Sequence, residues 1–333
     1  MLNQTAIGKA AEVAFGRSRP RPGESATAGR TRPRTVDRTL ELDGSTQVHY
    51  RLSGKESSPL AIVLGGISAD RQIERWWPEV TGARGALSSN RFQRLAIDWP
   101  VPENDRRMGV DEFADSLTAV LDALGIARVA AFVGASFGAM VGLAFGARHP
   151  DRIGRLIAIS GAHRSTPAAT AGRVIQRRII ESLASLGNPA RGIALARSLA
   201  LTSYRPAGLL DKRFYSTDPE QTLACIEQYL EYNGTSFAER FDAERYLALS
   251  LALDRHCVDP GSVHCRTELI GVTSDHLVPI SQLRELAGAI GIRARLHLVD
   301  SPYGHDAFLK STGLLNPLLE RLLAKPDGEH GHE

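Results

Sequence analysis

A serine lies between two glycines in the stretch VGASFGAM, residues 133–140. Gly134, Ser136 and Gly138 have the spacing G-x-S-x-G, with an apolar, strand-like run before them and a helix-like run after them. Small residues let the backbone turn sharply from strand to helix, which leaves the serine at the tip of the turn. The pattern predicts a nucleophilic Ser136, with the backbone N–H of Phe137 as an oxyanion donor. The alternative is a tight strand-to-helix turn without chemistry.

A serine hydroxyl needs a base, and proteins with this turn carry serine, acid and histidine in that order along the chain. His305 lies between the last strand-like and the last helix-like segment, and Asp275 follows the preceding strand-like segment. We therefore predict His305 as the base and Asp275 as the acid that orients it. His276 comes too early in this order, and His297 lies inside a strand-like run, where packing is the simpler interpretation.

The second oxyanion donor is expected in the loop after an early buried strand. The segment LAIVLGGIS, residues 60–68, ends its apolar run in Gly65 and Gly66. Either glycine can supply the backbone N–H, and the alternative is again a tight turn.

Composition limits the class of protein. The chain has 333 residues, 43% of them hydrophobic, 23% charged, and a net charge of +3, which is typical of a soluble enzyme and predicts no nucleic-acid partner. Apolar runs are shorter than the ~18 residues of a membrane span, so no membrane partner is expected. The three cysteines are Cys225, Cys257 and Cys265, too few for a disulfide scaffold, and we expect a cytoplasmic protein. The pairs His256-Cys257 and His264-Cys265 have no common zinc spacing, so no metal is predicted.

Strand-like and helix-like segments alternate over most of the chain, which predicts an α/β fold with a mostly parallel sheet covered by helices on both faces. The strands are expected at 45–52, 60–66, 91–100, 127–136, 151–162, 266–274 and 293–300, and the helices at 111–126, 137–150, 281–290 and 308–324.

The alternation stops between residues 162 and 264, where helical patterns predominate, so this block is predicted to be a helical lid inserted into the core. The core then comprises residues 39–161 and 265–325. Residues 1–38 are rich in Arg, Pro, Gly, Ser and Thr and are expected to form a disordered extension. Residues 326–333 are expected to be a flexible tail.

Several longer segments carry a family resemblance. They include LGGISADRQIERWWPEVTG, VGASFGAMVGLAFGARHPDRI, YLEYNG followed by RFDAERYL, SDHLVP and YGHDAFL. In this order they resemble the homoserine O-acyltransferases of methionine biosynthesis, over about residues 45 to 320. The resemblance implies the α/β-hydrolase fold and ping-pong transfer of an acetyl or succinyl group from acyl-CoA, a co-substrate, to the hydroxyl of L-homoserine. It also allows a homodimer formed through the lid.

The resemblance extends to residues that bind the acceptor. Arg177, in IQRRII, is expected to hold the carboxylate of the amino acid, with Arg178 as a rival. Asp306 is expected to pair with its amino group, and Tyr204, in LTSYRP, to contribute to the same site.

Two departures from the family leave the substrate open. The loop LGGIS stands where the family usually has HALTG, and the glycine-rich segment after the third core strand is missing. The acceptor can therefore be homoserine, L-serine or a related hydroxy amino acid, and the acyl group acetyl or succinyl. An esterase of the same fold and a non-catalytic binding protein are the further alternatives, and the intact Ser136, Asp275 and His305 argue against the second.

Overall fold

The computed structural model describes residues 34–102 and 107–324. Eight strands form one sheet in the order β1-β2-β4-β3-β5-β6-β7-β8. The strands from β4 to β8 are parallel, whereas β2 runs antiparallel to both β1 and β4. The strands are Arg34–Glu41 (β1), Gln47–Gly54 (β2), Leu60–Leu64 (β3), Gln93–Ile97 (β4), Ala131–Ala135 (β5), Arg155–Ile159 (β6), Arg266–Val272 (β7) and Ala294–Val299 (β8).

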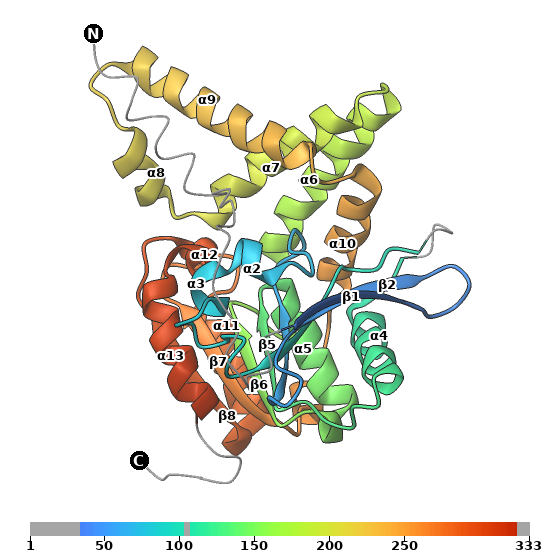
Figure 1. Ribbon diagram of the computed structural model, residues 1–333. Coiled ribbons are helices and arrows are strands. Elements are labelled where there is room, and N and C mark those ends of the chain that lie inside the picture. The colour runs from blue at the N-terminus through green and yellow to red at the C-terminus, as the bar shows by residue number, and fades with distance from the viewer. Residues whose placement is uncertain (1–33, 103–106, 325–333) are drawn as a thin grey trace, which may run out of the picture. The chain divides into compact units, whose positions relative to one another are not determined.

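Helices cover both faces of this sheet, as the sequence predicts (Figure 1). One hydrophobic cluster packs α4 (Val110–Ala123), α5 (Phe137–Arg148) and α11 (Ile280–Ile290) against the strands. A second cluster, on other strand residues, contains α3 (Pro78–Thr81) and α13 (Thr312–Ala324). The central strands β3, β5 and β6 are buried along their whole length, because helices lie over both of their surfaces. The fold is therefore the predicted α/β-hydrolase fold.

Five helices are inserted between the neighbouring strands β6 and β7. They are α6 (Pro167–Ser185), α7 (Pro189–Tyr204), α8 (Ala207–Phe214), α9 (Pro219–Ala238) and α10 (Ala243–Arg255). Figure 1 shows them above the sheet, and we call them the lid. The lid helices lie within the predicted block 162–264. The sequence signal for α8 is weak, because the helix has only eight residues and none of them is buried.

The first strand corrects the expected N-terminal boundary. Residues 34–38, expected in a disordered extension that ends at residue 38, form the first part of β1, which pairs with β2 over its full length. Most β1 side chains are exposed, so the segment has no apolar alternation that would reveal a strand. Asp37 also accepts hydrogen bonds from Arg51, at 2.9 and 2.7 Å. The rest of that extension and the tail 326–333 lie outside the described residues.

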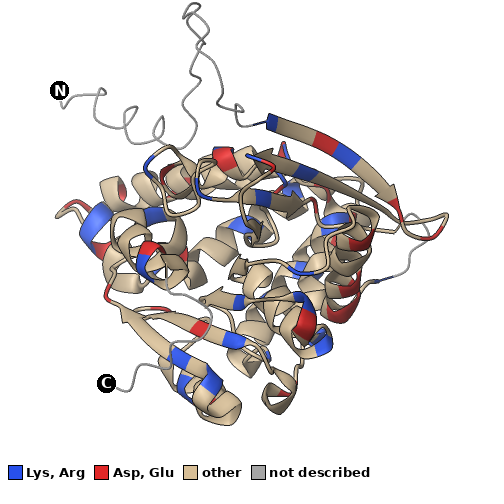
Figure 2. Cartoon of the chain, turned by 60° about the horizontal axis from the view of Figure 1, so that its bottom comes forward, with Lys and Arg blue, Asp and Glu red and all other residues tan. Residues whose placement is uncertain are grey.

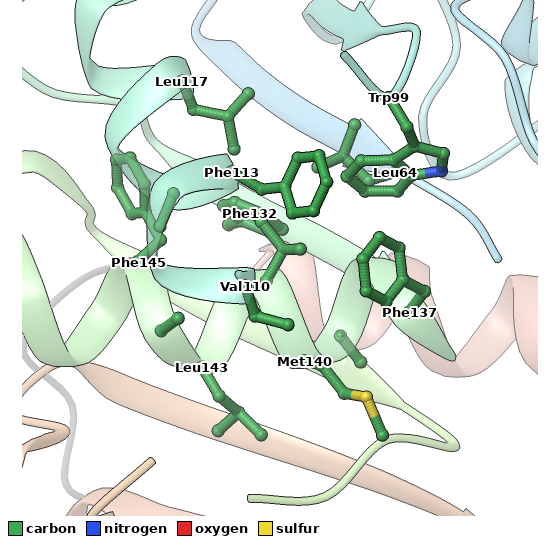
Figure 3. Packing of buried hydrophobic residues seen from close by; sticks show 14 of the residues in the cluster. Leu64, Trp99, Val110, Phe113, Leu117, Phe132, Phe137, Met140, Leu143 and Phe145 are labelled. Carbon is green, nitrogen blue, oxygen red and sulfur yellow. The ribbon is translucent and has the colours of Figure 1, made fainter. Parts of the chain in front are cut away.

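Aromatic packing supports the turn between β5 and α5. Phe137, the first residue of α5, is fully buried, and its ring meets the edges of Trp99 and Phe113 at centroid distances of 4.7 and 5.5 Å (Figure 3). The indole N–H of Trp99 donates to the carbonyl of Gly66 at 3.0 Å. The same three rings therefore hold both the turn and the loop after β3 in place.

The described surface carries both signs of charge. Figure 2 shows basic and acidic residues distributed together over the helices and loops. In the ranges 34–102 and 107–324, no helix has the length and apolar character of a membrane span.

Candidate active site

Ser136 sits at a strained turn between β5 and α5. Its φ is 55°, in the left-handed region that residues with a side chain rarely adopt. The turn is fixed by hydrogen bonds from the Ser136 N–H to the carbonyl of Ile159 and from the Gly138 N–H to the carbonyl of Gly65, both 2.8 Å. A β-carbon at Gly134 would collide with the backbone of Gly138, so the glycines of the motif are needed for close backbone packing.

Ser136, His305 and Asp275 form one hydrogen-bonded chain. His305 Nε2 lies 2.8 Å from Ser136 Oγ, and His305 Nδ1 lies 2.8 Å from Asp275 Oδ2. The other carboxylate oxygen of Asp275 accepts hydrogen bonds from the backbone N–H groups of Leu277 and Val278 at 2.9 and 3.1 Å. Asp275 is thus buried and oriented, and it holds the imidazole with Nε2 facing the serine.

The surroundings of His305 favour a basic imidazole. Burial is the largest single influence on its pKa and disfavours the charged form. The charge of Asp275 and the hydrogen bond to it, helped by Asp306, outweigh burial, so the pKa of His305 lies above its usual range. The histidine can therefore take a proton from Ser136 and stabilise the resulting imidazolium next to Asp275.

Two segments can supply oxyanion donors beside Ser136. The Phe137 N–H belongs to the first turn of α5, where backbone donors have no partner within the helix. Gly66 lines the cavity, and a β-carbon there would lie 4.0 Å from Ser136 Oγ. Gly65 has a supporting role instead, because its carbonyl accepts from Gly138 and a β-carbon would strike Ala69 and Trp76.

A cavity of about 130 Å³ lies between the catalytic chain and the lid. Ser136 and His305 line it, as do Tyr204 and Asp306. The Tyr204 ring lies 5.9 Å from the His305 ring, and Asp306 accepts a hydrogen bond from Arg205 Nε at 3.0 Å. The structure therefore places two of the three predicted acceptor-binding residues next to the histidine.

Arg177 is located differently from what the sequence suggested. It does not line the cavity; its Nη1 donates to Asp254 Oδ2 at 2.6 Å and to Ser250 Oγ at 2.9 Å, which joins α6 to α10. Its rival Arg178 is exposed on the same helix. Neither of the two adjacent arginines faces the catalytic serine, because the cavity side of α6 is the side of Arg173 and Gln176.

Three arginines that line the cavity, Arg164, Arg173 and Arg197, escaped the sequence analysis. Arg197, on α7, lies over the rings of Tyr204 and Phe237, 5.4 and 4.9 Å from their centroids. Arg173 is on α6, and Arg164, in the loop before α6, donates to Glu285 at 2.8 and 3.1 Å. A helical signal exists for Arg197, which precedes the cavity residue Tyr204 by seven residues, a spacing that places both side chains on one helix face.

No group of three or more His, Cys, Asp or Glu residues in the described ranges could hold a metal ion. His256, directly after α10, is buried and donates from Nε2 to the carbonyl of Ala162 at 3.0 Å, whereas Cys257 is exposed. Burial lowers the pKa of His256 to about 4. This histidine is therefore neutral and structural.

Comparison with known proteins identifies the family. A model of the alpha/beta hydrolase fold matches residues 84–312, more than half of the chain. The chain is 38% identical over 291 residues to a homoserine O-succinyltransferase of Xanthomonas campestris pv. campestris, covering 83% of this chain and 79% of that protein. It is 33% identical to an L-serine/homoserine O-acetyltransferase of Streptomyces lavendulae, covering 79% and 87%.

Solved structures agree on the fold. The crystal structure of homoserine O-acetyltransferase from Bacillus anthracis superimposes with a TM-score of 0.80 at 14% identity, over 90% of this chain and 100% of that one. At this identity the match bears on the fold alone. Together with the extended sequence matches, the fold, the lid and the Ser136–His305–Asp275 arrangement show that the chain belongs to the homoserine O-acyltransferase family of the α/β-hydrolase fold.

Proposed function

We propose that this protein transfers an acyl group from an acyl-CoA thioester to the hydroxyl of L-homoserine. The observation that carries the proposal is the hydrogen-bonded chain Ser136–His305–Asp275, which opens on a lid-covered cavity with charged groups of both signs. The similar homoserine O-succinyltransferase and L-serine/homoserine O-acetyltransferase both act on homoserine, which supports the choice of acceptor.

The first half-reaction acylates the enzyme. His305 Nε2 takes the proton of Ser136 as Oγ attacks the thioester carbonyl, and the oxyanion is stabilised by the backbone N–H of Phe137 and by the loop at Gly66. When the C–S bond breaks, the imidazolium returns the proton to the leaving thiolate. Coenzyme A departs and Ser136 carries the acyl group as an ester.

The second half-reaction repeats these steps with a new nucleophile. His305 removes the proton from the acceptor hydroxyl, which attacks the ester carbonyl on Ser136, and the same donors stabilise the oxyanion. The imidazolium then protonates Ser136 Oγ as the ester bond breaks. The lid is needed at this stage, because water that reaches the acyl-serine would hydrolyse it.

The acceptor is a zwitterion, and we propose that each of its two charges binds a cavity side chain of opposite charge. Arg197 faces the cavity, and the structure shows no ion pair from it to a carboxylate in residues 34–102 and 107–324, so its guanidinium can hold the α-carboxylate. Asp306 has one oxygen engaged by Arg205, which leaves the other for the ammonium group. Tyr204 lies between Arg197 and His305 and positions both. Arg197 thus replaces Arg177 as the carboxylate-binding residue.

An assay with separated half-reactions tests the proposal. Purified protein is mixed with acetyl-CoA or succinyl-CoA, and free thiol is measured with no acceptor, with L-homoserine and with L-serine. We expect a burst of one thiol per enzyme without acceptor and continuous turnover with homoserine. Continuous release at equal rates with and without an amino acid would identify a hydrolase, and turnover with serine alone would identify the other acceptor.

We also propose that the lid forms a homodimer contact. Six of the exposed large hydrophobic side chains belong to lid helices or the turns between them: Ile175, Leu186, Leu195, Tyr215, Leu223 and Tyr232. Exposed apolar side chains that cluster are typical of protein interfaces. Light scattering should give twice the chain mass, and Leu223→Glu should give the monomer; a monomeric wild type would contradict this proposal.

A further inference from the structure

An ion-paired cluster that reaches the cavity through Arg173 carries one more positive than negative charge. Asp254, on α10, accepts from Arg173 Nε at 2.7 Å through Oδ1 and from Arg177 Nη1 at 2.6 Å through Oδ2. Thr170 also donates to the Asp254 carboxylate, at 3.0 Å. One carboxylate therefore serves two guanidinium groups, and the three charged side chains are only 8–14% exposed.

An uncompensated charge at this depth is costly unless an anion completes the cluster. Arg177 is directed toward α10, where its Nη1 donates to Ser250 and Asp254, but Arg173 lines the cavity. Arg173 uses Nε for Asp254 and Nη2 for Ser165, at 2.8 Å, and no acceptor for its Nη1 is present in the described parts of the chain. The cavity thus contains a held guanidinium with donor capacity to spare.

The space beside Arg173 is open. The other cavity-lining residues of α6 before it are small: Ala168, Ala169 and Gly172. A β-carbon on Gly172 would meet no atom within 4 Å. Ser160, at the end of β6, lines the same cavity with a buried hydroxyl that has no hydrogen-bond partner, and it adopts a left-handed φ of 47°. A ligand with an anionic end would find both a cation and a hydroxyl donor here.

This cluster lies on a different wall from the acceptor site. Arg197, Tyr204 and Asp306 belong to α7 and to the turn Gly304–Asp306 that carries His305, whereas Arg173 and Asp254 belong to α6 and α10. The zwitterionic acceptor already has a partner for each of its charges. The remaining substrate group that must enter the cavity is the acyl group bound to Ser136, so the anion that completes the cluster belongs to the acyl group.

We propose that Arg173 selects a dicarboxylic acyl donor: it binds the distal carboxylate of a four-carbon acyl group, so that the preferred donor is succinyl-CoA rather than acetyl-CoA. The inference rests on the proposed function, because it names the donor of that reaction. An acetyl group carries no charge, so it would leave the excess positive charge of the cluster without a partner. Arg173 is in this sense a specificity-determining residue.

The test compares donors by their kcat/KM in the presence of homoserine. Three thioesters are used: succinyl-CoA, acetyl-CoA and butyryl-CoA, which has the length of succinyl without the distal carboxylate. Wild type should prefer succinyl-CoA to both others by tenfold or more, on the order expected for a charge-assisted contact. Preference for acetyl-CoA, or equal use of succinyl-CoA and butyryl-CoA, would overturn the proposal.

Variants of Arg173 test whether this residue causes the preference for succinyl-CoA. Arg173→Gln leaves Asp254 with one arginine, a neutral pair, so the fold should survive. The ratio of kcat/KM for succinyl-CoA to that for butyryl-CoA should fall by roughly 30-fold or more. Arg173→Lys should give a ratio between those of Arg173→Gln and wild type, since an ammonium keeps the positive charge but lacks the two parallel N–H donors of the guanidinium. Arg178→Gln, on the exposed side of the same helix, should leave the ratio unchanged.

The outcomes separate this inference from the proposed function. A structural role for Arg173 would lower kcat/KM for all donors equally and leave the ratio at its wild-type value, which would overturn the inference while transfer to homoserine persists. A rise in KM for homoserine in Arg173→Gln at a constant donor ratio would place Arg173 in the acceptor site instead. If no thioester supports transfer to homoserine in wild type, the proposed function itself fails.

Discussion

The imidazole Nε2 of His305 lies 2.8 Å from the hydroxyl oxygen of Ser136, although 169 residues separate the two in the chain. Ser136 follows β5 and His305 follows β8, so the contact depends on the order β5-β6-β7-β8 in the parallel sheet. The lid is inserted between them in sequence and leaves the contact intact. The catalytic chain is therefore a property of the core, and substrate selection is a property of the cavity that the lid encloses.

Ser136→Ala should abolish transfer while the protein stays folded. Loss of a covalent nucleophile should lower kcat by on the order of 10⁴ or more. Wild type incubated with acyl-CoA alone should carry the acyl group on the peptide that contains Ser136, as measured by mass spectrometry. Ser116→Ala serves as the control, because Ser116 is a buried serine of α4 whose hydroxyl donates to the Glu112 carbonyl of the same helix. An adduct on another residue would disprove the assignment.

Asp275→Asn should change the pH profile as well as the rate. In wild type the pKa of His305 is raised, so the free base, and with it acylation, is lost as pH falls through that raised value. Without the charge of Asp275, burial prevails and the pKa of His305 falls, so the acid limb of kcat/KM should move to lower pH. The plateau should drop by up to ~10⁴. Asp300→Asn, at an exposed position, should leave the acid limb of kcat/KM at its wild-type pH. If the acid limb of Asp275→Asn also stays at the wild-type pH, the proposed role of Asp275 is wrong.

Arg197→Met should weaken acceptor binding selectively. A desolvated contact between a guanidinium and a carboxylate is worth ~2–5 kcal/mol when one partner is truncated, so KM for homoserine should rise tenfold or more. The burst of thiol from acyl-CoA alone should keep its rate, because no amino acid takes part in that half-reaction. Arg191→Met, on the same helix but in an exposed pair with Glu231, is the matched control. Equal loss in both half-reactions would assign Arg197 to another task.

Two truncations should distinguish the contribution of residues 1–33 from that of β1. Deletion of residues 1–33 should leave turnover within about threefold, a change below ~1 kcal/mol. Deletion of residues 1–41 also removes β1, which leaves β2 as an uncovered edge strand, and should lower Tm by about 2 °C or more and promote aggregation. Thermal unfolding and light scattering measure both effects. Equal stability of the two truncated proteins would show that β1 contributes nothing to the sheet.

His256 should make stability depend on pH. Its pKa is lowered from 6.5 to about 4 on folding, mainly by burial. Below pH 6.5 the unfolded chain therefore binds more protons at this site, and the free energy of unfolding falls as pH decreases from 6.5 toward 4. The contribution lost at pH 5 is about 2 kcal/mol.

Denaturant titrations at pH 7 and pH 5 measure this loss. In His256→Gln, whose amide can still donate to the Ala162 carbonyl, the drop in the free energy of unfolding between the two pH values should be smaller by that amount. An equal drop in wild type and variant would locate the pH sensitivity elsewhere.

The sequence was sufficient for the core of the fold because its signals are local. The buried strands β3, β5 and β6 are short apolar runs, and each is followed by glycine or serine where the chain turns. The position of Ser136 follows from the glycines that flank it, and those of Asp275 and His305 follow from the strands that precede them. The sequence places residues 34–38 in the disordered extension, because both faces of β1 are largely exposed and its residues show no alternation of apolar and polar types.

Side chains of the lid were harder to place. Arg173, Arg177 and Arg178 lie within two turns of one helix, and an arginine side chain is equally compatible with solvent, an ion pair or a cavity. What decides between them is Asp254, 77 residues away from Arg177, whose carboxylate draws Arg177 toward α10. Arg197 was missed for the same reason, since its neighbour Phe237 comes from another lid helix.

The entry and exit of the lid have a consequence for how this family diversifies. The insertion leaves from β6 and returns to β7, two strands already paired along their length, and a bridge between Arg164 and Cys257 joins its two ends. Mutations, insertions and deletions inside the lid therefore leave the strand register undisturbed. Natural selection can therefore alter the side chains that the lid contributes to the cavity within one contiguous stretch of the gene, which contains none of Ser136, Asp275 and His305.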